Sequence, residues 1–266
     1  MAKNPLHEKL NNGRTAIGLW VNSPEIVELC GAIGFDWVMV DQMFSANDWQ
    51  RTEELIRTSE AAGITPVVRI QSNPWLGYDH RLAVDVGRAI GIGAQFILVS
   101  NSGKQEIEEC LVAAHDWHRR ALTIHPYADV GVPLPGLAEQ TFPPLVIPQP
   151  ETEAGLASLE ELIIHPEIHA VFIGMTDAGR AITGQAQPNF NDPRLWRFVD
   201  RAVELGRAND VVVGANTSYA YNLAELRARV ELLHEHGVRM IMVQGATFIF
   251  QVAALQLLGE LKSILG

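Results

Sequence analysis

A closed barrel of eight parallel strands and eight helices, the (β/α)8 or TIM barrel, is the fold class that the sequence predicts. Short apolar runs alternate eight times with longer segments of helical period. Runs such as Trp37–Val40 and Val211–Val213 are apolar throughout, as strands covered by helices on both faces require. An open doubly wound sheet is the structural alternative. It usually carries a phosphate-binding glycine fingerprint after the first strand, which the residues following Gly18 lack.

The expected strands are short runs rich in Val, Ile, Leu, Phe and Met. β-Branched and aromatic side chains favour the extended backbone, and runs of this length are typical of strands. We therefore expect strands at Ala16–Trp20, Asp36–Asp41, Pro66–Ile70, Gln95–Ser100, Leu145–Gln149, Ala170–Gly174, Val211–Asn216 and Met240–Gly245.

The expected helices alternate with these strands, and two begin with clear start signals. Ser23 precedes Pro24, and Asp192 precedes Pro193, so a capping side chain stands before a proline at the first helical position. The last expected helix is apolar on more than one face, which favours burial between subunits. The expected helices are Pro24–Ala32, Trp49–Ala62, Asp79–Ile90, Lys104–Arg119, Glu153–Ile164, Asp192–Arg207, Leu223–His236 and Phe248–Leu265.

One segment, His118–Pro144, breaks the alternation because it is rich in proline and glycine and has weak periodicity. A connection of this length in a barrel is often a lid or a subunit-contact loop, and we expect one of these roles here. The chain of 266 residues, 47% hydrophobic and 19% charged, is otherwise expected to form a single domain over residues 1–266.

The formal net charge of −11, without a cluster of basic residues, argues against nucleic acid as a partner. The first residues contain no apolar leader, and no later stretch is expected to approach membrane-spanning length. The sequence thus predicts a cytoplasmic protein without a membrane partner. Cys30 and Cys110 lie far apart in helical segments, which favours buried free thiols over a disulfide or a metal site.

Polar residues at or just after strand ends are the candidates for chemistry, because the active site of such barrels lies at the carboxyl ends of the strands. Glu151 and Asp177 follow two consecutive strands, and neighbouring carboxylates repel one another unless a cation lies between them. This all-oxygen pair would suit Mg²⁺, Mn²⁺ or Co²⁺. Alternatively, each acid caps the helix or turn that follows it. The full set is Asp41, Arg69, Ser100, Gln149, Glu151, Asp177, Asn216 and Gln244.

Several of these positions lie in motifs that resemble the HpcH/HpaI aldolase/citrate lyase family, in its metal-dependent pyruvate aldolase branch. The similarity runs in register from about Gly18 to the C-terminus. The matching segments are Gly18–Trp20, Gly34–Asp41, Val67–Arg69, Gly93–Gln95, Gln149–Leu159 with its metal glutamate, and Phe172–Asp177 with the second metal ligand.

The resemblance implies a role for each matching residue. Glu151 and Asp177 would bind the metal, Asp41 would orient a metal-bound water, and Arg69 would stabilise the enolate. Substrate contacts would come from Arg69 and from Trp20, Gln149, Gly174, Met175 and Thr176. Relatives are trimers of dimers in which the last helix packs on a neighbouring subunit, so the resemblance also implies a homohexamer.

The sequence departs from the family at its acid/base residue. Relatives continue the second strand as Asp-x-Glu-His, whereas this chain has Phe44 at the histidine position and Gly91 where the supporting aspartate stands. Phenylalanine cannot transfer a proton. The candidate substitutes are Tyr78, His80, His118 and His125. Met43 and Phe44 also predict a mouth suited to a bulkier or aromatic acceptor.

The sequence therefore predicts a metal-dependent carbon–carbon lyase that acts by aldol or retro-aldol chemistry. Its partners would be a 2-oxo acid such as pyruvate, reacting through its enolate, and a carbonyl acceptor. One alternative is an oxaloacetate-type decarboxylase, which needs the same enolate but less proton transfer. Another is a barrel that binds a metabolite without catalysis, although the retained charged residues at the rim argue against it.

Overall fold

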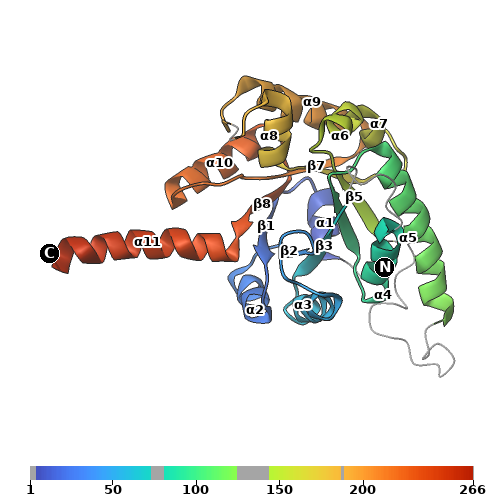
Figure 1. The fold of residues 1–266 in the computed structure, drawn as a ribbon, viewed down its shortest axis with the longest axis horizontal. Coiled ribbons are helices and arrows are strands. Elements are labelled where there is room, and N and C mark those ends of the chain that lie inside the picture. The colour runs from blue at the N-terminus through green and yellow to red at the C-terminus, as the bar shows by residue number, and fades with distance from the viewer. Residues whose placement is uncertain (1–3, 73–80, 125–143, 187–188, 266) are drawn as a thin grey trace.

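The computed structural model describes residues 4–72, 81–124, 144–186 and 189–265. Within these residues eight parallel strands form a nearly closed barrel with helices around it, which confirms the predicted TIM barrel (Figure 1). Hydrogen-bonded neighbours run in the order β5-β4-β3-β2-β1-β8-β7-β6. The strands are β1 Ala16–Val21, β2 Trp37–Asp41, β3 Thr65–Gln71, β4 Phe96–Ser100, β5 Leu145–Gln149, β6 Ala170–Ile173, β7 Val212–Asn216 and β8 Met240–Gly245.

The helices agree with the expected ones within a few residues, with four differences. Two helices, α1 and α8, were not expected, α5 extends to Ile124, and the segment expected as one helix at Glu153–Ile164 is divided at Ser158. The helices are α1 Pro5–Asn11, α2 Pro24–Ile33, α3 Trp49–Ala61, α4 Arg81–Gly91, α5 Lys104–Ile124, α6 Glu153–Ala157, α7 Leu159–Ile163, α8 Met175–Thr183, α9 Pro193–Asn209, α10 Leu223–Glu235 and α11 Ala246–Leu265.

The extension of α5 corrects the boundary of the expected loop, because the segment from His118 to Ile124 is helical. Residues 125–143 lie outside the described residues. The helix α5 begins beside the carboxyl end of β4 and runs back along the barrel. The end of α5 and the start of β5 therefore both lie at the amino ends of the strands.

Large side chains fill the amino half of the barrel interior. Trp37 and Phe172 are buried inside it, in edge-to-face contact with their ring centroids 6.1 Å apart. Glycines on neighbouring strands make space for them: a Cβ on Gly18 would lie 2.1 Å from the Trp37 ring, and one on Gly214 would lie 2.6 Å from Phe172. The buried side chain of Leu6 on α1 packs against this interior cluster.

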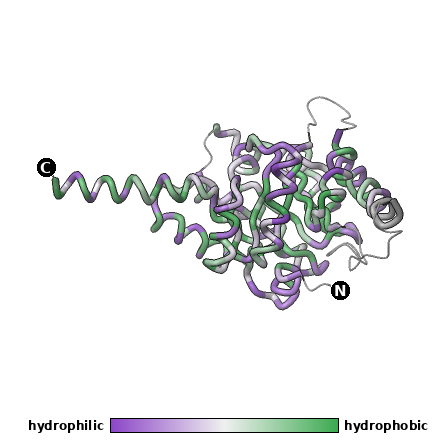
Figure 2. The backbone as a smooth tube through the Cα atoms, turned by 90° about the horizontal axis from the view of Figure 1, so that it is seen from below, coloured by the Kyte–Doolittle hydropathy of each residue, from purple (hydrophilic) through white to green (hydrophobic). Residues whose placement is uncertain are grey.

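A second and larger core lies between the strands and the surrounding helices, where hydrophobic residues concentrate (Figure 2). Cys30 of α2 and Cys110 of α5 belong to this core as free buried thiols, as expected. Burial raises the pKa of the Cys30 thiol to about 11. Both residues are therefore packing residues.

The helix α11 leaves the barrel directly after β8 and extends away from the other described elements (Figures 1 and 2). Its 20 residues are long and apolar enough to cross a membrane, with a mean hydropathy of 1.4 over a window of which 6% is buried. The expectation that no stretch approaches membrane-spanning length is thus wrong here. The charged residues Glu260 and Lys262 are too few to lower the mean hydropathy of the helix below that of a membrane span. One such helix is weak evidence for a membrane span.

Candidate active site

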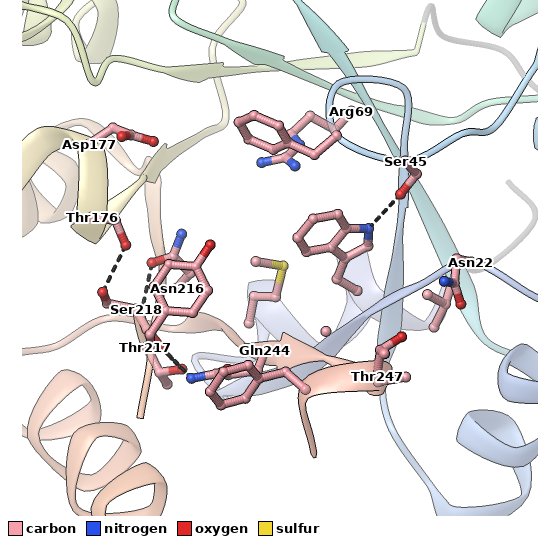
Figure 3. A pocket seen from close by; sticks show the side chains of 18 of the residues that line it. Asn22, Ser45, Arg69, Thr176, Asp177, Asn216, Thr217, Ser218, Gln244 and Thr247 are labelled. Atoms are coloured by element: carbon pink, nitrogen blue, oxygen red, sulfur yellow. Dashed lines mark hydrogen bonds between the residues drawn. The ribbon is translucent and has the colours of Figure 1, made fainter. Parts of the chain in front are cut away.

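A cavity of about 860 Å³ lies at the carboxyl ends of the strands, where the active site was expected. The strand ends, the loops after them and the first turns of α8 and α11 form its wall. Figure 3 shows side chains from these separate elements converging on one space, with Arg69 and Asp177 both pointing into it.

Arg69 projects from β3 into this cavity and is held in a buried ion pair. Its Nε donates to Asp41 Oδ1 at 2.6 Å, and the two residues are register partners on β2 and β3. The Asp41 carboxylate, fully buried, also accepts the backbone N–H groups of Met43, Phe44 and Ser45. Asp41 therefore fixes both the guanidinium and the loop after β2.

Two aromatic rings flank the guanidinium of Arg69. Its Cζ lies 5.3 Å from the ring centroid of Trp20 and 5.3 Å from that of Phe44, within the range of cation–π attraction. Trp20 is oriented by a hydrogen bond from its Nε1 to Ser45 Oγ, which Figure 3 shows. Arg69 Nη2 is buried and has no partner among the described residues. This nitrogen thus has hydrogen-bonding capacity that no described residue uses.

Glu151 is buried at the carboxyl end of β5 and does not cap a helix. Its Oε1 accepts the backbone N–H of Asn101 at 3.3 Å, and its Oε2 accepts Nε2 of Gln149 at 2.9 Å. The following helix is capped instead by Thr152. Burial, then the nearby charge of Asp177, raise the pKa of Glu151 to about 8, although Arg69 and both hydrogen bonds oppose this rise.

Asp177 lies in the first turn of α8, which Gly174 begins without a side-chain cap. Its Oδ1 accepts a hydrogen bond from Nη1 of Arg180 at 2.6 Å. Nε of Arg180 also donates to the carbonyl of Ala186, so this arginine ties Asp177 to the segment after α8. Both acids, Glu151 and Asp177, line the cavity.

The cavity thus brings together most of the residues expected at the strand ends. Trp20, Arg69, Gln149, Glu151, Thr176, Asp177, Asn216 and Gln244 all line it. Met175, the first residue of α8, is buried in the core, and Ser100 is buried with its hydroxyl donating to the carbonyl of Ile70.

The candidate substitutes for the acid/base histidine are not among the described residues that line the cavity. Tyr78, His80 and His125 lie outside the described residues. The backbone of His118 lies in α5, 14 residues after Lys104 and thus about 21 Å along the helix, on the side away from the cavity. Its side chain is outside the described residues.

Tyr219 and Arg180 are among the cavity residues that the sequence does not predict. Tyr219 lies three residues after the last residue of β7. Polar residues just after strand ends are the signal that points to Glu151 and Asp177, and the same signal, extended into the loop after β7, points to Tyr219. Arg180 carried no comparable signal, because its place depends on α8, an unexpected helix.

Comparisons with known proteins agree with this architecture. The chain is 24% identical over 249 residues to a hydroxypyruvate/pyruvate aldolase of Agrobacterium fabrum, covering 85% of each chain. It is 26% identical over 191 residues to a hydroxypyruvate/pyruvate aldolase of Deinococcus radiodurans, covering 67% of this chain and 64% of the relative.

A solved structure shows the same fold. The crystal structure of an HpcH/HpaI aldolase/citrate lyase family protein from Burkholderia cenocepacia J2315 matches with a TM-score of 0.74 at 21% identity, covering 98% of this chain and 100% of the other. The family model described as HpcH/HpaI aldolase/citrate lyase matches residues 16–245, from the start of β1 to the end of β8. The chain therefore belongs to the HpcH/HpaI aldolase/citrate lyase family.

Proposed function

We propose that the protein is a divalent-metal-dependent carbon–carbon lyase that acts on a 2-oxo acid such as pyruvate, in the aldol or retro-aldol direction. The observation that carries this proposal is the convergence of Glu151, Asp177 and Arg69 on one cavity. Membership of a lyase family and the names of the aldolase relatives support the same reaction class and argue against a non-catalytic binding barrel.

Glu151 and Asp177 are the residues that would hold the metal. No cluster of three or more His, Cys, Asp or Glu side chains suited to a metal occurs among the described residues, so these two acids would be joined by substrate and water. The fit of these residues to a metal ion rests on charge. Burial and the negative charge of Asp177 both disfavour the ionised form of Glu151, and a bound cation would offset both effects. Oxygen ligands suit Mg²⁺, Mn²⁺ or Co²⁺.

When bound, the cation would act as a Lewis acid toward the carboxylate and ketone oxygens of the 2-oxo acid. The chain itself would supply the rest. Arg69 uses Nε for Asp41 and has Nη2 unpaired, so it can donate to the ketone oxygen as negative charge grows there. Trp20 and Phe44 flank the guanidinium and restrict water around it.

Asp41 is a positioning residue in this scheme. Its carboxylate already accepts four hydrogen bonds, from Arg69 and from three backbone N–H groups, so its lone pairs are used within the protein. We propose that it fixes Arg69 rather than orienting a water molecule directly. Gln149 plays the same part for Glu151, and its unpaired Oε1 can accept a hydrogen bond from a ligand.

The experiment that tests the proposal measures metal affinity in Glu151→Ala and Asp177→Ala. Each variant removes one ligand, so each should lose metal binding and metal-dependent binding of pyruvate. Glu153→Ala is the matched control, because Glu153 is exposed two residues away and does not line the cavity. Unchanged metal affinity in both site variants would overturn the assignment. Turnover of oxaloacetate beside aldol substrates would distinguish the decarboxylase alternative.

We further propose a cytoplasmic homo-oligomer, a homohexamer built as a trimer of dimers, in which α11 packs on a neighbouring subunit. A soluble monomer would leave an unusually large apolar surface in water. The argument is the run of exposed apolar side chains on the projecting helix: Phe250, Leu255, Leu257, Leu258, Leu261, Ile264 and Leu265.

A further inference from the structure

The turn after β7 has a backbone conformation that an ordinary residue adopts only under strain. Ser218 has a φ of 52°, in the left-handed region that disfavours residues with a Cβ. Such strain persists where surrounding contacts hold it, and it is concentrated at functional sites. The strain at Ser218 therefore points to a functional residue that this turn holds in place.

Four hydrogen bonds hold this turn in place. The carbonyl of Ser218 accepts Nε2 of Gln244 at 2.6 Å, and its hydroxyl is 2.8 Å from that of Thr176 at the start of α8 (Figure 3). Its N–H donates to Oδ1 of Asn216 at 3.1 Å. Nη1 of Arg229 on α10 donates to the carbonyl of Thr217 at 3.0 Å. The residue after Ser218 is thus rigidly positioned beside the helix that carries Asp177.

That residue is Tyr219, which lines the cavity. Its ring centroid lies 5.8 Å from that of Phe248, another lining residue on the first turn of α11. Tyr219 is nevertheless 59% exposed. The Tyr219 side chain thus contacts Phe248 and remains open to a ligand in the cavity.

The cavity needs a group that can transfer a proton, and Tyr219 is the described residue that remains for this role. The lining side chains include no His, Cys or Lys among the residues that the structure describes. Glu151 and Asp177 are the proposed metal ligands, and an arginine keeps its proton. Phe44 cannot exchange one. A phenol can both donate and accept a proton.

We propose that Tyr219 transfers the proton of the acceptor oxygen, a role that rests on the proposed lyase function. In cleavage, the phenolate takes the proton of the C4 hydroxyl. The electron pair of that O–H bond becomes the C=O bond of the released aldehyde, and the pair of the C3–C4 bond stays with the enolate. In the addition direction, the phenol returns the proton to the new alkoxide. The enolate takes its proton at C3 from solvent water, separately from Tyr219, and no further co-reactant is required.

The test compares two reactions in Tyr219→Phe, which keeps the ring against Phe248 and removes only the hydroxyl. One reaction is aldol turnover with pyruvate and an aldehyde, and the other is metal-dependent exchange of the pyruvate methyl protons in D₂O, which needs no acceptor. We expect turnover to fall by about 10²- to 10⁴-fold, with metal affinity and methyl exchange unchanged. Tyr221→Phe is the matched control, since Tyr221 is two residues away and does not line the cavity.

The possible results distinguish a failure of the role proposed for Tyr219 from a failure of the proposed lyase function. Absence of metal-dependent methyl exchange in the wild-type protein would overturn the proposed function itself. Normal exchange with unchanged turnover in Tyr219→Phe would overturn the role of Tyr219 alone and turn attention to Tyr78 and His80. Loss of exchange together with turnover would overturn the assignment to the acceptor oxygen.

Discussion

Replacing Gly174 by alanine should displace the carboxylate of Glu151. A Cβ built on Gly174 would lie 1.9 Å from Glu151 Oε2 and 2.7 Å from Nε2 of Gln149. Ordinary contact begins near 3.4 Å, so the carboxylate or the backbone must move by about 3.4 − 1.9 = 1.5 Å. Overpacking of this kind costs roughly 1–3 kcal/mol of folding free energy. The same movement should break the hydrogen bond that orients Glu151.

Isothermal titration of Mn²⁺ into Gly174→Ala would measure the consequence for the proposed metal site. Loss of an outer-shell partner typically lowers metal affinity by about 10- to 100-fold, and displacement of a ligand should lower it at least as much. Gly245→Ala is the matched control, because Gly245 lines the same cavity and its added Cβ would meet Trp20 at 3.6 Å, an ordinary contact. Wild-type metal affinity in Gly174→Ala, with unchanged unfolding, would refute the reasoning.

Three further predictions concern charge and assembly. Without metal, folded Glu151 keeps its proton up to a pKa of about 8 rather than 4.5, so wild-type stability relative to Glu151→Gln should fall as pH rises from about 5 to 8. Urea unfolding in a chelator at pH 5, 7 and 9 checks this, and a difference independent of pH would contradict it. Arg69→Lys keeps the charge but loses the planar fork, so turnover should fall more than 2-oxo acid affinity. Equal losses in kinetics and equilibrium binding would make Arg69 a simple binding group. Light scattering at micromolar concentration should find an oligomer that Leu255→Asp dissociates, and a wild-type monomer would contradict the assembly.

The barrel could be predicted from the sequence because its strands are apolar throughout and its helices are amphipathic. The segment Trp37–Val40, for example, has no alternation and is buried at every position. The two helices that escaped prediction are short, with seven residues in α1 and nine in α8. The helix α8 contains Gly179 and starts at a glycine without a side-chain cap, so its sequence gives no start signal.

The site could be predicted as far as position along a strand determines it. Arg69, Glu151 and Asp177 converge because parallel strands present their carboxyl ends at one face of the barrel. Distances in three dimensions could not be predicted in the same way. The four hydrogen bonds on Asp41 and the flanking of Arg69 by Phe44 depend on how the loop after β2 folds back over β3.

Exchange of the methyl protons of pyruvate in D₂O, followed by NMR, tests the central claim most directly, because it reports enolisation without any acceptor. We predict exchange that requires a divalent cation, stops in a chelator, and is lost in both Glu151→Ala and Asp177→Ala. Exchange that persists in the chelated wild-type protein, or in both variants with metal present, would contradict the account.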